Sequence, residues 1–288
     1  MINISIITPV YNRALLLRDI FSNLLEQTFF EFEWIIVDDG STDNCDEIVS
    51  SFKTDLFSIV YLKQDNKGKH IAVNKGVAIA KGVLTCILDS DDVFFSNNIL
   101  SEVYSLYHQN DFSTLQCVSV SGLCIDVSTQ KVIGVPFPED NIISDHIRMR
   151  NNKNIYGDKC EFFLTAILQK YPFPQLGNEK FLTEAVVWNR ISLKYKTIYI
   201  NKIFKKVRYL PDGLSANMTK LYNLYPMGWI LFYNESSIRP FKLRTRIASC
   251  YKYILLSKKQ NYSNKIIFIN CMNKILFFPA FLGWMIKK

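Results

Sequence analysis

Segments rich in apolar β-branched residues alternate with segments of helical periodicity through the first 110 residues of the chain. This alternation constrains the fold most, because successive strand–helix units form a parallel sheet that is covered by helices. We therefore expect an α/β fold with a mostly parallel central sheet flanked by helices. The expected strands are Ile2–Thr8, Glu33–Val37, Ser58–Leu62 and Val83–Leu88, and the expected helices are Ala14–Thr28, a segment capped by Ser41 or Thr42, and Ile71–Ala80.

The pattern changes after residue 110. It predicts a hairpin around Asp126–Gln130, a helix at Lys180–Tyr195, a strand at Thr197–Ile200 and, beyond Thr219, helices broken at Pro226, Pro240 and Pro279. A chain of 288 residues with 49% apolar residues can bury one large core. We expect one main domain, residues 1–215, built from the parts 1–110 and 111–215, and a helical C-terminal extension, residues 216–288.

The net charge of +8 is concentrated at the C-terminal end, where Lys and Arg recur from Arg239 to Lys288 and no acid follows Glu235. A basic and aromatic tail suits contact with an anionic membrane surface. Under this interpretation the side chains that reach into the surface are Phe277, Phe278, Phe281 and Trp284. The alternative is a pair of packed helices with a charged outer face. No nucleic-acid-reading module accompanies the basic tail, so a nucleic-acid partner is not expected.

The seven cysteines form no CxxC pair and none has metal-like spacing to a histidine, which argues against structural zinc. Such cysteines suit a reducing compartment as buried thiols. The N-terminus lacks the basic region of a signal peptide, and polar residues interrupt the apolar segment Ile266–Ile286. We expect a cytoplasmic protein, with peripheral attachment to the inner face of the cell membrane as an option.

Three of the expected strands end in polar motifs, namely Thr8-Pro9-Val10-Tyr11-Asn12, Asp38-Asp39-Gly40-Ser41 and Asp89-Ser90-Asp91-Asp92. Ligands of open α/β sheets bind at the carboxyl ends of the strands. The acids of the third motif repel one another unless a cation compensates, and oxygen ligands alone suit Mg²⁺ or Mn²⁺. A solvated acidic loop or a helix cap is the alternative for this motif, and a capped turn is the alternative for Asp38 and Asp39.

The segments TPVYN, VDDGSTD and LDSDD, taken in this order over residues 2 to about 110, resemble the family 2 glycosyltransferases with the GT-A fold. The resemblance implies an inverting, metal-dependent transfer of a sugar from a nucleotide-sugar, with UDP as the favoured nucleotide. The acceptor would be a saccharide or a lipid-linked saccharide, because bacterial members often build surface polysaccharides. Residues 1–110 would then bind the donor, and residues 111–215 would supply the base and the acceptor site.

The resemblance also assigns roles to individual residues. Thr8, Pro9, Tyr11 and Asp39 would line the nucleoside pocket, Asp91 would hold the metal, and Asp89 would lie near the ribose or the sugar. Asp92 would either contact the residues that hold the metal or cap a helix. Many members carry an Arg-Asn pair where this chain has Val73-Asn74, so Lys69, or else Lys67 or His70, would supply positive charge for the diphosphate.

Glu184 is the expected base, with Glu179 as a substitute. Each could equally be a surface acid near the N-terminus of a helix. Residues Asn201–Asn217 form either a loop that closes over the donor or an ordinary connection.

Other functions fit the sequence less well. The chain lacks the GxGxxG of a Rossmann dehydrogenase and the GxxxxGK[ST] of a P-loop enzyme. A glycoside hydrolase also uses two carboxylates but needs neither metal nor nucleotide. An inactive nucleotide-sugar-binding scaffold or sensor with the same fold stays open, because only one acid occupies the expected base motif.

Overall fold

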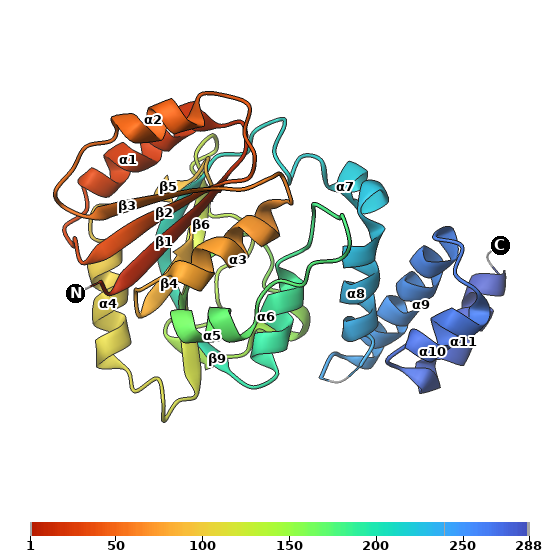
Figure 1. Ribbon diagram of the computed structural model, residues 1–288. Coiled ribbons are helices and arrows are strands. Elements are labelled where there is room, and N and C mark those ends of the chain that lie inside the picture. Colours follow the sequence, from red (N-terminus) through yellow and green to blue (C-terminus); the bar gives the residue numbers. More distant parts are fainter. Residues whose placement is uncertain (1, 239, 287–288) are drawn as a thin grey trace.

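The computed structural model describes residues 2–238 and 240–286. A nine-stranded sheet with the order β3-β2-β1-β4-β8-β6-β9-β5, and with β7 paired to β9, forms its centre (Figure 1). The strands are β1 (Ile4–Val10), β2 (Phe32–Asp38), β3 (Ser58–Lys63), β4 (Leu84–Ile87), β5 (Val93–Phe94), β6 (Cys117–Asp126), β7 (Ile142–Ser144), β8 (Lys159–Leu164) and β9 (Lys196–Val207). Strands β1 to β4 pair in parallel, whereas β8 runs antiparallel to β4 and β6. The predicted α/β fold is confirmed.

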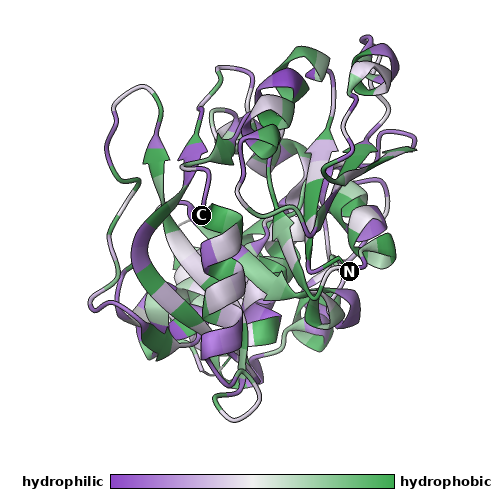
Figure 2. Cartoon of the chain, turned by 90° about the vertical axis from the view of Figure 1, so that its left-hand side faces the viewer, coloured by the Kyte–Doolittle hydropathy of each residue, from purple (hydrophilic) through white to green (hydrophobic). Residues whose placement is uncertain are grey.

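Helices cover both faces of this sheet, which explains why its first strands are apolar without alternation. They are α1 (Leu17–Leu25), preceded by the short helix η1 (Ala14–Leu16), α2 (Cys45–Ser51), α3 (Lys69–Ile79), α4 (Ile99–Gln109), the short helix η2 (Arg148–Asn152), α5 (Thr165–Lys170) and α6 (Ala185–Ser192). Trp34 and Ile36 pack with α1, α2 and α4, while Ile35 and Val37 pack with α3 and α6 on the other face. In Figure 2 the covering helices alternate between hydrophilic and hydrophobic stretches, as expected for helices with one buried side.

The C-terminal helices are α7 (Met218–Leu224), α8 (Pro226–Ser236), α9 (Leu243–Lys259), α10 (Asn264–Asn270) and α11 (Lys274–Ile286). They lie to one side of the sheet domain in Figure 1 and have an apolar cluster of their own. Arg190 of α6 binds Glu235 of α8 with two nitrogens, which ties the two regions together. Within the described residues no helix is both long and apolar enough to cross a bilayer. The domain boundary at residue 215 stays a prediction.

Several predicted element boundaries are wrong for identifiable reasons. The helix α2 begins only at Cys45, because Ser41 and Thr42 bind Asp38 and Asn12 instead of capping it. The helix expected from Lys180 begins at Ala185. The turn after Asp126 forms, but the returning arm of the expected hairpin is a single bridge between Ile125 and Val132.

Two of the three prolines expected to break helices stand between helices, Pro226 between α7 and α8 and Pro240 between α8 and α9. Pro226 is also the first residue of α8, where its missing N–H costs nothing. Pro279 lies inside α11, whose buried Phe277 and Ala280 hold the helix against α9. Phe277 is buried, and Phe281 and Trp284 pack against the same apolar cluster, so three of the four aromatic residues expected at a membrane face inward. Arg239 and Lys288 lie outside the described residues.

All seven cysteines are buried free thiols, in agreement with their expected role as small apolar groups.

Candidate active site

A cleft of about 800 Å³ opens where β1, β2 and β4 end, which is a volume typical of small-molecule sites. It brings together seven of the eight predicted site residues, namely Pro9, Tyr11, Asp39, Lys69, Asp89, Asp91 and Glu184. The eighth, Thr8, is fully buried, and its hydroxyl accepts a hydrogen bond from the Trp34 indole at 2.9 Å. Thr8 therefore lies beneath the cleft and not in its wall, which corrects its expected place.

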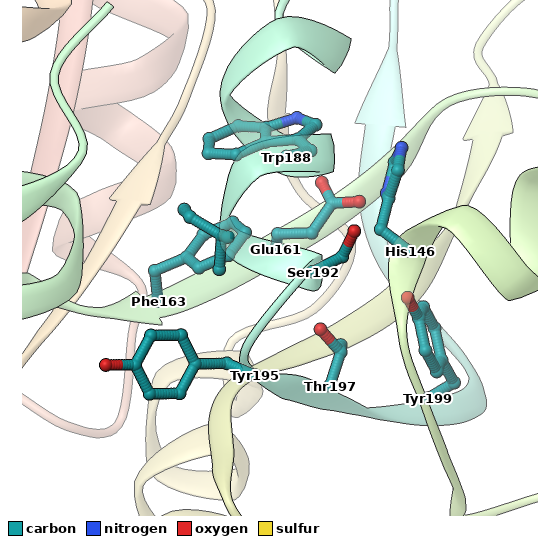
Figure 3. Close-up of a pocket in the computed structure, with 9 residues that line it drawn as sticks. His146, Glu161, Phe163, Trp188, Ser192, Tyr195, Thr197 and Tyr199 are labelled. Carbon is teal, nitrogen blue, oxygen red and sulfur yellow. The ribbon is translucent and has the colours of Figure 1, made fainter. Parts of the chain in front are cut away.

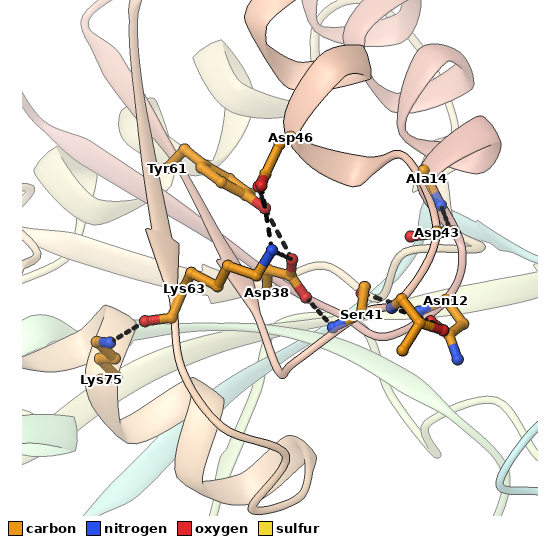
Figure 4. Close-up of polar contacts among 10 residues, drawn as sticks. Asn12, Ala14, Asp38, Ser41, Asp43, Asp46, Tyr61, Lys63 and Lys75 are labelled. Atoms are coloured by element: carbon orange, nitrogen blue, oxygen red, sulfur yellow. Dashed lines mark hydrogen bonds and ion pairs between the residues drawn. The ribbon is translucent and has the colours of Figure 1, made fainter.

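The first two polar motifs are joined by hydrogen bonds (Figure 4). The backbone N–H of Asn12 donates to the Ser41 hydroxyl at 3.0 Å, and the N–H of Thr42 donates to the Asn12 side chain at 2.7 Å. The fully buried carboxylate of Asp38 accepts from the Ser41 N–H and from the Tyr61 hydroxyl, both at 2.7 Å. Asp38 therefore stabilises the turn, and the neighbouring Asp39 is the acid that faces the cleft.

Asp39 holds the loop that precedes α3. One of its oxygens accepts from the N–H of Lys67 and from the Gln64 amide, and the other accepts from the N–H of Gly68, each at 2.8 Å. Tyr11 lies at the mouth of the cleft with 47% of its surface exposed, so its ring is available for stacking. A nucleobase placed between these residues would meet the apolar ring face of Tyr11 and the hydrogen-bond acceptor of Asp39.

Lys69 is the first residue of α3 and bridges two acids from different elements. Its ammonium lies 2.7 Å from Asp89, at the end of β4, and 2.9 Å from Glu184, just before α6. Burial opposes the charge of Lys69, but the two carboxylates outweigh burial and raise its pKa. Burial would raise the pKa of Asp89, but Lys69, Lys205 and Arg13 outweigh it and hold that pKa below its usual value.

Two further cations neutralise the remaining acids of the third motif. The Arg13 guanidinium contacts Asp91 at 2.5 Å and Asp212 at 3.4 Å. The Lys205 ammonium, on β9, contacts the buried Asp92 at 2.6 Å. Because α4 begins only at Ile99, Asp92 is half of a buried ion pair and caps no helix. Sequence reasoning missed Arg13 and Lys205, since each pairs with an acid far away in the chain.

The carboxylates of the cleft suit a metal ion that takes most of its ligands from water and substrate phosphates. In residues 2–238 and 240–286, no group of three or more His, Cys, Asp or Glu side chains is placed to hold a metal ion. Mg²⁺ and Mn²⁺ need only one or two carboxylates when water and substrate phosphates complete the shell. Asp91, which already attracts a cationic side chain, fits that requirement.

Glu179, Val73 and Asn74 have structural roles. Both oxygens of Glu179 accept hydrogen bonds from the first turn of α8, from the N–H of Met227 at 2.7 Å and of Gly228 at 2.8 Å. Glu179 is therefore a helix cap and not a substitute base. The Asn74 side chain binds the backbone of Phe173, and Val73 is part of an apolar cluster, so this pair lies away from the cleft.

The segment expected to close over the donor starts later than predicted, because β9 continues to Val207. Residues 208–215 line one wall of the cleft. Arg208 pairs with Asp19 at 3.0 Å, and the Tyr209 hydroxyl donates to Asp158 at 2.6 Å. These contacts hold the segment in the wall of the cleft.

Glu161, on β8, is an acid that sequence reasoning missed. It lines the main cleft and also a second cavity of about 10 Å³, which has room for about one water molecule (Figure 3). Burial and the nearby Glu184 raise the pKa of Glu161, and Arg150 opposes this. The strand pattern alone marks Glu161 as one polar residue among apolar neighbours, which is the only signal that could have identified it.

The chain is similar to known glycosyltransferases. The model of the glycosyl transferase family 2 matches residues 5–168. The glycosyltransferase GlyG of Streptococcus pneumoniae is 38% identical over 109 residues, which cover 38% of this chain and 36% of that protein. The chain spans less than half the length of this relative and of a glycosyltransferase of Rickettsia felis.

Two solved structures share the fold. S. aureus TarS in complex with UDP-GlcNAc is 16% identical, with a TM-score of 0.64 over 97% of this chain and 79% of that one. The mannosyltransferase PcManGT of Pyrobaculum calidifontis, in complex with GDP-Man and Mn²⁺, is also 16% identical, with a TM-score of 0.53 over 99% of this chain and 88% of that one. Since the family model matches more than half of the residues, the chain belongs to the glycosyl transferase family 2 and has the GT-A fold expected from its three motifs.

Proposed function

We propose that this protein transfers a sugar from a nucleotide-sugar, most simply a UDP-sugar, to an acceptor hydroxyl, with inversion at the anomeric carbon. The observation that carries the proposal is the position of Lys69 between Asp89 and Glu184. It places a candidate base next to the acids of the third motif in one open cleft. The nucleotide-sugars held by the two similar structures support the donor class.

The nucleoside end of the donor lies at Tyr11 and Asp39 in this proposal. Tyr11 stacks on the base, and Asp39 accepts a hydrogen bond from it while keeping its bonds to the loop before α3. The diphosphate then extends toward Lys69 and Arg13, the cations that lie against Asp89 and Asp91. Positive charge is thus available where the leaving group becomes more negative.

Glu184 is the proposed base. The acceptor hydroxyl attacks the anomeric carbon from the side opposite the diphosphate, and its proton passes to the Glu184 carboxylate. Lys69 contacts this carboxylate and Asp89, so it orients Glu184 and reduces the repulsion between the two acids. Direct displacement of this kind inverts the configuration at the anomeric carbon.

Asp91, with Asp89 beside it, is the proposed holder of Mg²⁺ or Mn²⁺. The bound ion would stabilise the charge that develops on the leaving diphosphate. Arg13 contacts one oxygen of that carboxylate, so Asp91 would either share its charge between Arg13 and the ion or exchange one for the other. The Mn²⁺ in the mannosyltransferase structure supports this proposal.

A lipid-linked saccharide of surface polysaccharide synthesis is the proposed acceptor, at the cytoplasmic face of the cell membrane. In this proposal residues 1–110 bind the donor, and residues 111–215 supply the base and the acceptor site. Residues 216–288 contact the membrane surface. The basic C-terminal helices support this arrangement.

Calorimetric titration of UDP, with and without Mn²⁺, tests the donor site. We expect the wild type to bind UDP more tightly with Mn²⁺, and Asp91→Asn to lose that dependence, because one of its ligand oxygens becomes an amide nitrogen. Asp43→Asn is the matched control, since Asp43 accepts from the Ala14 N–H outside the cleft lining. It should bind UDP as the wild type does.

The failure of UDP and of other nucleoside diphosphates to bind the wild type would contradict the proposal. The scaffold interpretation would be favoured if the wild type binds UDP but turns over no donor, and if Glu184→Gln binds UDP as tightly as the wild type does. Equal metal dependence in Asp91→Asn and the wild type would show that the metal is held elsewhere.

A further inference from the structure

The helix α11 is apolar around its whole circumference, yet only one side of it is covered. Phe277 and Ala280 are buried, and Phe281 packs on Phe277 within the cluster shared with α9. The opposite side, which we call the outer face of α11, consists of Ile275, Phe278, Leu282, Met285 and Ile286, all exposed. A helix without a polar side normally has both sides covered.

The outer face of α11 is continuous. Its residues follow the helical spacing of three and four, so they stack along one line of the helix. Exposure is high, at 85% for Ile275, 60% for Phe278 and 55% for Leu282. Ile269 and Met272, in the segment that leads into α11, are also exposed. Single exposed apolar residues are ordinary, but a row of this kind marks a surface that binds something.

The charge around this face indicates what covers it. Residues 240–286 contain eight Lys or Arg and no Asp or Glu. Lys274 begins α11, where it caps the end of α10 and lies over the Phe268 ring, and Lys258 lies over the Trp284 ring. An anionic bilayer attracts apolar side chains flanked by cations, because the apolar side chains insert into the hydrocarbon and the cations bind the anionic headgroups.

Geometry limits how the chain meets such a bilayer. The described part of α11 has 13 residues, about 20 Å of helix, and no described helix is long and apolar enough to cross a bilayer. An interfacial position, with the helix lying along the surface, fits this length. In Figure 1, α11 lies at the end of the molecule away from the sheet, so membrane contact leaves the cleft uncovered.

We infer that the outer face of α11 binds the surface of an anionic lipid bilayer and inserts Ile275, Phe278 and Leu282 among the lipids. This surface differs from the one expected from the sequence, since Phe277, Phe281 and Trp284 pack inside and only Phe278 belongs to both. The inference deepens the proposed function and rests on it, because a lipid-linked acceptor is what the enzyme would meet at a bilayer.

Vesicle flotation with the full chain tests the inference. We expect the wild type to float with phosphatidylcholine vesicles that contain phosphatidylglycerol, less well with phosphatidylcholine alone, and less well as salt rises. Leu282→Glu should weaken binding by about tenfold to a hundredfold, the loss expected from one buried leucine. Ile275→Glu, at the most exposed position, should act in the same direction and is the variant least able to disturb folding.

Leu56→Glu is the matched control, because Leu56 is 47% exposed but lies between α2 and β3 in the sheet domain. It should float as the wild type does. Lys265 is an exposed lysine of α10, and Lys265→Ala should weaken binding to the anionic vesicles by about fivefold and leave binding to phosphatidylcholine unchanged. Each variant is also titrated with UDP, which reports the cleft independently of the bilayer.

Three outcomes would overturn the inference. The wild type fails to float with any vesicle, or Leu282→Glu and Ile275→Glu float as well as the wild type. Alternatively, sedimentation shows a wild-type dimer that Leu282→Glu separates, which would make this face an interface between two copies. UDP binding without flotation refutes the inference alone, whereas flotation without nucleotide binding refutes the proposed function alone.

Discussion

Charge balance around single side chains determines what each acid of the cleft can do. Asp89 shares Lys69 with Glu184, Asp91 is paired with Arg13, and Asp92 is paired with Lys205. The three adjacent aspartates therefore have three different cationic partners. Asp92 is the most buried of these aspartates, with its pKa raised to about 6 by burial and by the neighbouring acids against the opposing effect of Lys205.

Glu184→Gln should reduce the rate of donor turnover by about a hundredfold or more while UDP affinity stays within about twofold. The amide keeps the shape of the side chain but cannot take a proton from the acceptor. Release of UDP from an accepted donor measures the effect. Glu179→Gln is the control: it loses one of the two bonds that cap α8, but it should keep its turnover because Glu179 lies outside the cleft lining. Comparable losses in both variants would contradict the assignment of Glu184.

The seven predicted residues that line the cleft lie near the end of a strand or the start of a helix. Their place could be derived locally, because strand ends meet at one edge of the sheet. Thr8 was misplaced because side chains alternate along a strand, and its side chain points toward Trp34 instead of the cleft. Arg13 and Lys205 depend on contacts between distant segments, which no local pattern contains, and the strand pattern marks Glu161 only as a polar residue among apolar ones.

At the scale of elements, the loop before α3 is the connection on which the cleft depends most. Asp39 binds its backbone, Lys69 follows it, and Gly68 lies against the segment that leads to Glu184. Gly68 has a φ of +93°, and a Cβ there would lie 2.1 Å from the Lys180 carbonyl oxygen. The close approach of these two segments places Lys69 next to Glu184.

Gly68→Ala should destabilise the fold by about 1–3 kcal/mol and also weaken UDP binding, because the loop has to move away from Lys180. Urea unfolding and calorimetry measure the two effects. Gly177→Ala is the matched control, since Gly177 also has a positive φ of +57° but no atom near its missing Cβ. It should lose stability through backbone strain alone and bind UDP normally. Normal UDP affinity in Gly68→Ala would refute this role of the loop.

The two halves of the sheet were predictable to different degrees. In the first 110 residues the strands follow from their apolar runs, since β1 and β2 are buried on both faces and β4 nearly so. In the second half, β8 enters the sheet antiparallel between β4 and β6, and η2 and α5 flank it. Such an insertion depends on pairing with strands from elsewhere in the chain, so no local signal specified it.

At the scale of the whole molecule, two histidines oppose stability in acid. Burial lowers the pKa of His70 from 6.5 to about 4, and burial together with Arg150 lowers the pKa of His146 to about 3. Below pH 6.5 the unfolded chain therefore binds protons that the folded protein does not. The free energy of unfolding should fall as the pH drops from about 6.5 toward 4.

His70→Gln measures the share of one histidine in that loss. Its free energy of unfolding should fall by about 2.5 kcal/mol less than that of the wild type between pH 7 and pH 4.5, since the substitution removes one proton-binding group from the unfolded chain. Urea unfolding at both pH values gives this difference, and protonation of the carboxylates cancels between the two proteins. His108→Gln, which removes an exposed imidazole of α4, is the control. If it flattens the pH dependence as much as His70→Gln does, burial of His70 does not cause the acid sensitivity, and the loss has to be assigned to acids that titrate in the same range.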